Sequence, residues 1–176
     1  YNNFARENRL KLQIKKQFEH YLAPDMVKKL QKNPELLKLG GDTRDMTFLF
    51  CDIRGFTPIS EKFQSDPQGL TKVINKFLTP MTNIIMKNGG TIDKYMGDCI
   101  MAFWNAPIQQ HNHRSLAVNS ACEMMNKLKE LNDSDSFGPD IKINIGIGIN
   151  SGPAVVGNMG SDQRFDYSVL GDAVNL

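Results

Sequence analysis

The order of hydrophobic patterns along the chain predicts an α+β fold with a ferredoxin-like βαββαβ succession. Short apolar runs typical of strands alternate with two long amphipathic patterns typical of helices. The strand patterns lie at 46–53, 91–104 and 141–149, and the helix patterns at 67–88 and 114–131. Helices that connect strands of one sheet in this order cover one of its faces. The charged, helix-prone residues 1–22 add an N-terminal helical extension.

The first segment places its apolar side chains at spacings of three and four, at Leu10, Ile14, Phe18, Tyr21 and Leu22. This spacing predicts an amphipathic helix. The helix either packs on its own domain or pairs with a second copy as a parallel signalling helix. A second helix is expected to begin at Pro24 and to end at Asn33-Pro34, because the residue before a proline disfavours helical geometry.

The first strand, residues 46–53, is followed by Arg54 and by the turn Gly55-Phe56-Thr57. Its apolar run is too short to cross a membrane. Pro58 then begins a short helix. Backbone N–H groups at a turn that opens a helix can hold phosphate, although an ordinary strand–helix loop has the same composition.

The helix at 67–88 ends at Gly89-Gly90, and the hairpin 91–104 turns at Met96-Gly97. His111 and His113 have the spacing of a metal pair, but zinc needs further ligands, so we interpret them as the cap of the next helix. That helix is expected to bury Leu116, Ala117, Ala121, Met124, Met125 and Leu128.

Five isoleucines alternate with other residues from Ile141 to Ile149, which predicts a strand with one apolar face. Ser151-Gly152 is expected to turn the chain, so that residues 154–158 form a partner strand. A last short strand is expected at 165–170. The residues after it, from Gly171, have the pattern of a helix start.

Composition restricts the class of protein. A length of 176 residues, 40% of them hydrophobic, suits one domain with its own core. The net charge of +2 does not indicate nucleic acid or an anionic membrane as a partner. Three cysteines without a CxxC spacing argue against a disulfide framework or a zinc site and favour a reducing compartment.

Two aspartates, Asp52 and Asp98, each lie close to a glycine at the end of a predicted strand. A carboxylate there is costly to bury unless a cation or a hydrogen bond compensates it. Two of them on neighbouring central strands would form an oxygen site suited to Mg²⁺. Either aspartate alone is a common turn residue, but the pair favours a metal site. Their neighbours Cys51 and Cys99 are expected to face away from the carboxylates, as core residues.

These two segments resemble the signature strands of the class III nucleotidyl cyclase catalytic domain. They are FLFCDIRGFT at 48–57 and DKYMGDCIMAFW at 93–104. The resemblance covers most of residues 22–176. It implies a palm-type sheet, signalling or transducer helices at 1–41, and a catalytic domain at 42–176 that stops before the catalytic arginine of the family.

The resemblance implies a reaction in which ATP is converted to 3′,5′-cyclic AMP and pyrophosphate. It implies two Mg²⁺ or Mn²⁺ ions that clamp the attacking and leaving oxygens, held by Asp52, Asp98 and the Ile53 carbonyl. It also implies that the turn at 55–57 holds the phosphates, with Arg164 as an additional cation.

In the family, the residues at the positions of Lys94 and Ser168 read the purine. A lysine with Asp, Thr or Ser accompanies ATP, whereas guanylate cyclases carry Glu and Cys, so the resemblance is to the adenylate type. Without the family context, Lys94 would be interpreted as a surface lysine and Ser168 as a strand-end hydroxyl. Asn175 is implied to orient the ribose or the transition state.

The resemblance further implies a head-to-tail homodimer, in which one subunit supplies the metal aspartates and the other the purine-reading residues and Asn175. The alternatives are a guanylate cyclase and a non-catalytic nucleotide-sensing module on the same fold. Because the chain runs from Tyr1 to Leu176 without a starting methionine, we expect a cytoplasmic part of a longer protein, whose sensor or membrane anchor lies elsewhere.

Overall fold

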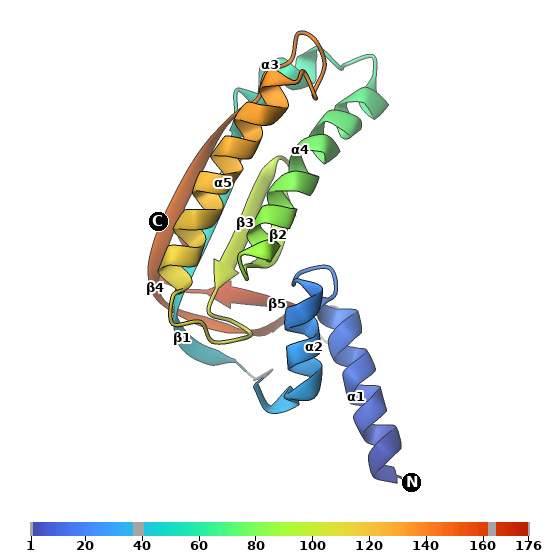
Figure 1. The fold of residues 1–176 in the computed structure, drawn as a ribbon, viewed down its shortest axis with the longest axis vertical. Coiled ribbons are helices and arrows are strands. Elements are labelled where there is room, and N and C mark those ends of the chain that lie inside the picture. The colour runs from blue at the N-terminus through green and yellow to red at the C-terminus, as the bar shows by residue number, and fades with distance from the viewer. Residues whose placement is uncertain (1, 37–40, 162–164, 176) are drawn as a thin grey trace.

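The computed structural model describes residues 2–36, 41–161 and 165–175, and it confirms the α+β fold. In this part of the chain, antiparallel strands form one sheet in the order β2-β3-β1-β4-β5 (Figure 1). Its strands are β1 (Asp42–Arg54), β2 (Thr91–Met96), β3 (Cys99–Trp104), β4 (Asn144–Gly160) and β5 (Phe165–Leu170). The first four have the predicted ferredoxin-like order, and β5 extends the sheet beyond β4.

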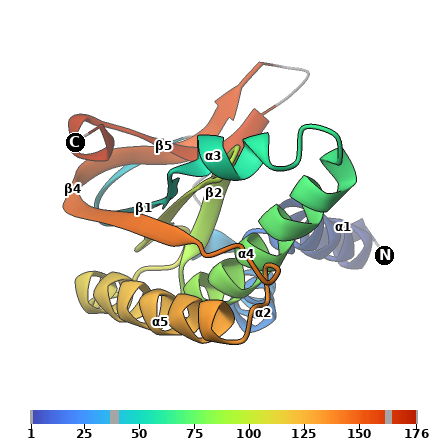
Figure 2. The same cartoon turned by 90° about the horizontal axis from the view of Figure 1, so that it is seen from above.

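Helices α4 (Pro67–Lys87) and α5 (His113–Asp133) cover one face of the sheet, as predicted (Figure 2). Between β1 and α4 lies the short helix α3 (Phe56–Glu61). The odd-numbered residues at the end of β1 point toward the helices and are buried: Leu49, Cys51 and Ile53. Met125 was expected to be inward but is 49% exposed, because it falls outside the buried stripe formed by Ala117, Met124 and Leu128.

The opposite face of the sheet is covered in part by the N-terminal helices, a position that the sequence pattern did not predict. These are α1 (Asn2–Phe18), α2 (Pro24–Lys32) and the 3₁₀ turn η1 (Pro34–Leu36). Ile14 and Phe18 of α1 are buried in one cluster with Phe48 of β1 and Phe103 of β3. Figure 1 shows the beginning of α1 extending away from the sheet, and Phe4 there is 72% exposed. The end of α1 therefore packs on its own domain.

The end of α1 is joined to both edge strands of the sheet. The ring of Phe18 meets the ring of Tyr167 of β5 edge-on, with centroids 5.3 Å apart. Just beyond the helix, the carbonyl of Tyr21 accepts a hydrogen bond of 3.0 Å from the N–H of Ile92 in β2. Movement of α1 would therefore act directly on β2 and β5.

We expect Phe18→Ala to lower the free energy of unfolding by about 3–5 kcal/mol, because the ring is fully buried between α1 and the sheet. Urea unfolding followed by circular dichroism measures this change. Phe4→Ala on the same helix is the matched control and is expected to stay within about 0.5 kcal/mol. Equal effects of the two substitutions would show that α1 does not pack on the domain in solution.

The prediction of a turn at Ser151-Gly152 is wrong, because β4 continues through both residues as one strand. β1 offers a ladder long enough to pair with β4 from Asn144 to Val156, and within it Ser151 is opposite Thr47. Gly152 has a packing role instead. A Cβ at this position would lie 2.7 Å from the Cβ of Ala173, so glycine allows the 3₁₀ turn η2 (Asp172–Val174) to lie against β4.

The sheet is curved enough that its two edge strands, β2 and β5, come into contact at one place. The segment from Gly171 is a short 3₁₀ turn rather than the start of an α-helix, and Asn150 of β4 donates a hydrogen bond of 2.8 Å to the Ala173 carbonyl there. None of the helices in the described ranges is both long and apolar enough to cross a membrane.

Candidate functional site

Asp52 and Asp98 meet at one end of the sheet. Asp52 lies near the end of β1, and Asp98 lies in the two-residue turn between β2 and β3, where Gly97 adopts a φ of 63°. The sequence pattern had suggested a central strand for Asp98, but Asp98 lies in a turn. Since β3 pairs with β1, this turn lies beside the end of β1. The N–H of Ile53 donates to Asp98 Oδ2 over 3.2 Å, which holds the Asp98 carboxyl beside the backbone of the residue that follows Asp52.

The proximity of these two acidic side chains is electrostatically unfavourable without a cation. Burial is the main cause that raises the pKa of the Asp98 carboxyl, backbone N–H donors lower it, and the neighbouring Asp52 carboxylate raises it again. In the described residues no group of three or more His, Cys, Asp or Glu side chains could share a metal ion. Two carboxylates are nevertheless enough for Mg²⁺, which completes its octahedron with water and substrate phosphates. The pair therefore fits such an ion.

Of the neighbouring cysteines, Cys51 has the orientation expected from strand alternation, whereas Cys99 is half-buried and belongs to neither core cluster. Cys51 is buried among the residues that face α4 and α5, whereas Asp52 is exposed. Burial raises the pKa of the Cys51 thiol to about 12, with smaller contributions from Cys99 and the two aspartates. Cys51 is therefore a protonated core residue at neutral pH.

Arg54 was not selected from the sequence, although the structure places its guanidinium over the residue that pairs with Asp52. A Cβ on Gly146 of β4 would lie 2.5 Å from two nitrogens of the Arg54 guanidinium, so Arg54 lies over this glycine. Gly146 is paired with Asp52. The sequence contained one indication of this position, because residues 52 and 54 lie on the same face of a strand. Arg164, which was selected, lies outside the described residues.

The turn after β1 has a left-handed residue, since Gly55 has a φ of 64° and precedes the first residue of α3. Phe56 is partly buried against the core under α4 and α5, which anchors the turn. Thr57 is exposed, and its carbonyl accepts a hydrogen bond of 2.8 Å from Ser60 Oγ. Phosphate binding by this turn stays a prediction.

Ser168 contacts a residue that sequence reasoning missed, Asp93, which precedes Lys94 in β2. Ser168 Oγ of β5 lies 2.9 Å and 3.1 Å from the two carboxylate oxygens of Asp93 in β2. The pairing of β2 with β3 slips by one residue between Ile92 and Lys94, so Asp93 is the extra residue of a β-bulge. A bulge turns a side chain away from the direction that alternation would give it. Asp93 is only 8% exposed, whereas Lys94 is exposed.

Asn175 lies at the end of η2 and is exposed, with its backbone N–H bonded to the Asp172 carbonyl over 3.0 Å. Its described contacts join it neither to the aspartate pair nor to Ser168. In the described contacts of one copy, Asp98 is linked to Ile53, next to Asp52, and Ser168 is linked to Asp93, next to Lys94. None of these contacts joins one pair to the other.

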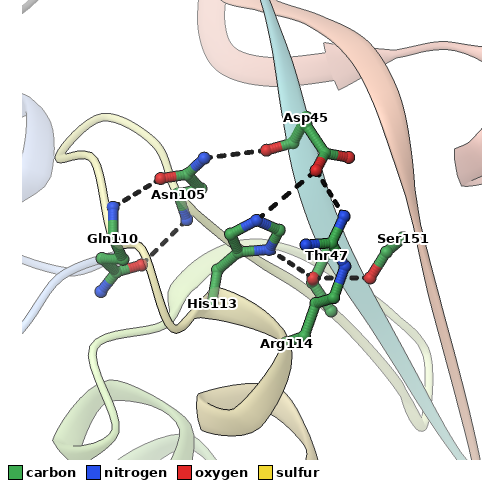
Figure 3. Close-up of polar contacts among 7 residues, drawn as sticks. All are labelled: Asp45, Thr47, Asn105, Gln110, His113, Arg114 and Ser151. Atoms are coloured by element: carbon green, nitrogen blue, oxygen red, sulfur yellow. Dashed lines mark hydrogen bonds and ion pairs between the residues drawn. The ribbon is translucent and has the colours of Figure 1, made fainter.

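A second polar cluster, shown in Figure 3, surrounds His113 farther along β1. The run 111–113 lies at the start of α5, as expected, with Asn112 at the N-cap position but without a capping hydrogen bond from its side chain. The His113 side chain is buried, with Nδ1 2.6 Å from Thr47 Oγ1, which in turn lies 2.7 Å from Ser151 Oγ. Burial and Arg114 lower the pKa of His113, and Asp45 raises it. The cluster has the residue types of a hydrolytic triad, but Thr47 is fully buried and cannot reach a substrate. We interpret the cluster as structural.

Comparisons with known proteins give one consistent result. The family described as "Adenylate and Guanylate cyclase catalytic domain" matches residues 41–176. An adenylate cyclase of Anabaena cylindrica is 39% identical over 138 residues, which are 76% of this chain and 26% of that protein. The chain thus spans about a quarter of this curated relative.

Two solved structures are similar in both fold and sequence. The guanylyl cyclase Cya2 has a TM-score of 0.70 and 41% identity, over 77% of this chain and 68% of that one. The adenylyl cyclase CyaB from P. aeruginosa has a TM-score of 0.71 and 38% identity, over 77% of this chain and 69% of that one. Relatives that act on either purine are therefore about equally similar.

Proposed function

The chain belongs to the family of adenylate and guanylate cyclase catalytic domains, and we propose that it is the adenylate type, converting ATP to 3′,5′-cyclic AMP and pyrophosphate. The observation that carries this proposal is the hydrogen bond from the N–H of Ile53 to Asp98 Oδ2, which holds the Asp98 carboxyl at the end of β1, next to Asp52. Two adjacent acidic groups are a costly arrangement unless cations are bound between them and a substrate.

The metal-binding residues that we propose are Asp52, Asp98 and the carbonyl of Ile53, with two Mg²⁺ or Mn²⁺ ions. Such ions, when bound, stabilise negative charge on the attacking and leaving oxygens of a phosphoryl transfer. The chain contributes fixed carboxylate oxygens whose positions are set by the strand end and by the N–H of Ile53.

The phosphates of ATP are proposed to lie against the turn at Gly55, Phe56 and Thr57, whose backbone N–H groups begin α3. Arg54 supports this position, because its guanidinium lies over the glycine opposite Asp52 and can neutralise phosphate charge. Arg164 is a second proposed phosphate ligand. Positive charge here would hold the triphosphate so that its α-phosphorus faces the ribose 3′-hydroxyl.

The choice of ATP is supported by the residue types of Lys94 and Ser168, and by the hydrogen bond that joins Ser168 to Asp93, the residue before Lys94. An ammonium group donates hydrogen bonds and suits an adenine ring nitrogen, which accepts them. Asn175 is proposed to orient the ribose. The second candidate is a guanylate cyclase, which the 41% identity to the guanylyl cyclase Cya2 favours.

We propose that a head-to-tail homodimer completes the site, with the metal aspartates from one copy and the purine-reading residues from the other. The separation of these groups within one copy supports this arrangement. The N-terminal helices of residues 1–41 are proposed to transmit a signal to the catalytic residues 42–176. The contacts of Phe18 with Tyr167 and of Tyr21 with Ile92 support this role, because each lies one residue from Ser168 or Asp93.

The test is the formation of cyclic AMP from ATP by the full-length protein, measured against protein concentration. We expect a rate that requires Mg²⁺ or Mn²⁺, disappears with a chelator, and rises per molecule with concentration because dimers form. ATP binding without product would instead favour a nucleotide-sensing module. A higher kcat/KM for GTP than for ATP would favour the guanylate type.

A further inference from the structure

Asp93 is a buried carboxylate whose described partner is the Ser168 hydroxyl. The bulge in β2 turns it toward β5, where both of its oxygens lie within 3.1 Å of Ser168 Oγ. A carboxylate this buried needs a hydrogen bond to stay charged. Ser168 is half-buried, and the purine of the proposed function would approach its oxygen from the side away from Asp93.

When Asp93 is ionised, the hydrogen bond between it and Ser168 can have only one direction. A carboxylate accepts hydrogen bonds and has none to donate, whereas a serine hydroxyl has a single hydrogen and two lone pairs. The hydrogen of Ser168 must therefore point to Asp93. The side of Ser168 Oγ away from Asp93 then carries lone pairs alone.

We propose that Asp93 is a positioning residue for base selection, which orients Ser168 as a hydrogen-bond acceptor and so favours a 6-amino purine over a 6-keto purine. The inference rests on the proposed function, because it assumes that Ser168 faces the purine. The exocyclic amine of adenine can donate to the Ser168 lone pairs. The 6-keto oxygen of guanine or hypoxanthine is an acceptor, and it would face a second acceptor with no hydrogen between them.

The groups around Asp93 act on its ionised state in both directions, and burial, which opposes that state, has the largest effect. Burial raises the pKa of the Asp93 carboxyl, the Ser168 hydrogen bond and the adjacent Lys94 ammonium lower it, and Asp166 raises it slightly. Lys94 thus has two effects: it donates to the base and it stabilises the charge that orients Ser168.

The decisive variant is Asp93→Asn, which keeps the shape of the side chain. The new amide can donate to Ser168, and this frees the serine hydrogen to turn toward a keto oxygen. We expect the ratio of kcat/KM for ATP to that for GTP to fall about tenfold in the full-length protein, the effect of one hydrogen bond. The matched control is Asp166→Asn, which removes an exposed charge near Asp93 and is expected to leave the ratio unchanged.

Repeating the substitution in a Ser168→Ala protein distinguishes an effect on the orientation of Ser168 from an effect on folding. In Ser168→Ala there is no hydroxyl to orient, so adding Asp93→Asn is expected to leave the ATP:GTP ratio as it is in Ser168→Ala alone. A structural role of Asp93 would lower turnover of both nucleotides equally in either background. Such an equal loss, with the ratio unchanged from the unmodified protein, overturns the inference.

The unmodified protein offers a test that needs no variant. Inosine triphosphate has the 6-keto group of GTP but lacks its 2-amino group. We expect its dissociation constant, measured by isothermal titration calorimetry, to exceed that of ATP about tenfold or more. Equal binding of inosine triphosphate and ATP overturns the inference while leaving the proposed function intact. Tighter binding of GTP than of ATP overturns the adenylate assignment itself.

Discussion

Asp52→Asn and Asp98→Asn are each expected to lower cyclic AMP formation by the full-length protein at least about a thousandfold. Each substitution keeps the size of the side chain and removes one of the two charges that meet at the end of β1. A bound cation contributes several kcal/mol of charge stabilisation to a phosphoryl transfer, and each 1.4 kcal/mol or so is a factor of ten in rate. The assay measures product under saturating Mg²⁺ or Mn²⁺.

The matched control for this loss is Asp133→Asn, an exposed carboxylate at the end of α5. It changes the net charge by the same amount and is expected to keep the rate within a factor of about two. Thermal unfolding of all three variants checks that they fold. Asp52→Asn and Asp98→Asn proteins that fold and keep full activity would contradict the proposed metal site.

The second large effect concerns the base. We expect Lys94→Glu combined with Ser168→Cys to shift the ratio of kcat/KM for ATP to that for GTP at least about a hundredfold toward GTP. Glutamate accepts hydrogen bonds where lysine donates them. It therefore matches the N–H groups of guanine, whereas the acceptor nitrogens of adenine would have no donor. A site built around specific hydrogen bonds rejects the wrong partner strongly, because its buried polar groups then stay unpaired.

The control for the double substitution is Lys72→Glu with Ser65→Cys, at exposed positions outside the proposed site. It makes the same chemical changes and is expected to leave the ATP:GTP ratio unchanged. Product formation from each nucleotide is measured at several concentrations, so that kcat and KM are separated. An unmodified protein that already prefers GTP would show that Lys94 and Ser168 do not select adenine as proposed.

Much of the fold was predictable because its patterns are local. The helices α4 and α5 and the strand β5 were found from apolar spacing, and β5 has the predicted bounds. β4 was divided in error because Ser151-Gly152 resembles a turn. Its pairing with the long strand β1 kept the chain extended, and this partner is distant in sequence.

The candidate site also contains residues that local sequence indicates and residues whose importance depends on distant strands. Asp52, Asp98, Lys94 and Ser168 could be selected because each lies in a recognisable run of neighbours. Arg54 was overlooked because its significance comes from Gly146 on another strand, which leaves room for its guanidinium. The position of α1 on the second sheet face was also hidden, since an amphipathic helix has the same pattern whichever apolar surface it covers.

Residue order alone was thus sufficient for the fold class and for choosing Asp52, Asp98, Lys94 and Ser168 as candidate site residues, because short-range periodicity and motif spacing are carried by adjacent positions. The tertiary structure decided how those residues are arranged. Asp93 and Ser168 are 75 positions apart and lie on opposite edge strands. They meet because the sheet is curved and because a bulge in β2 redirects one side chain, and both depend on strand pairing across the whole domain.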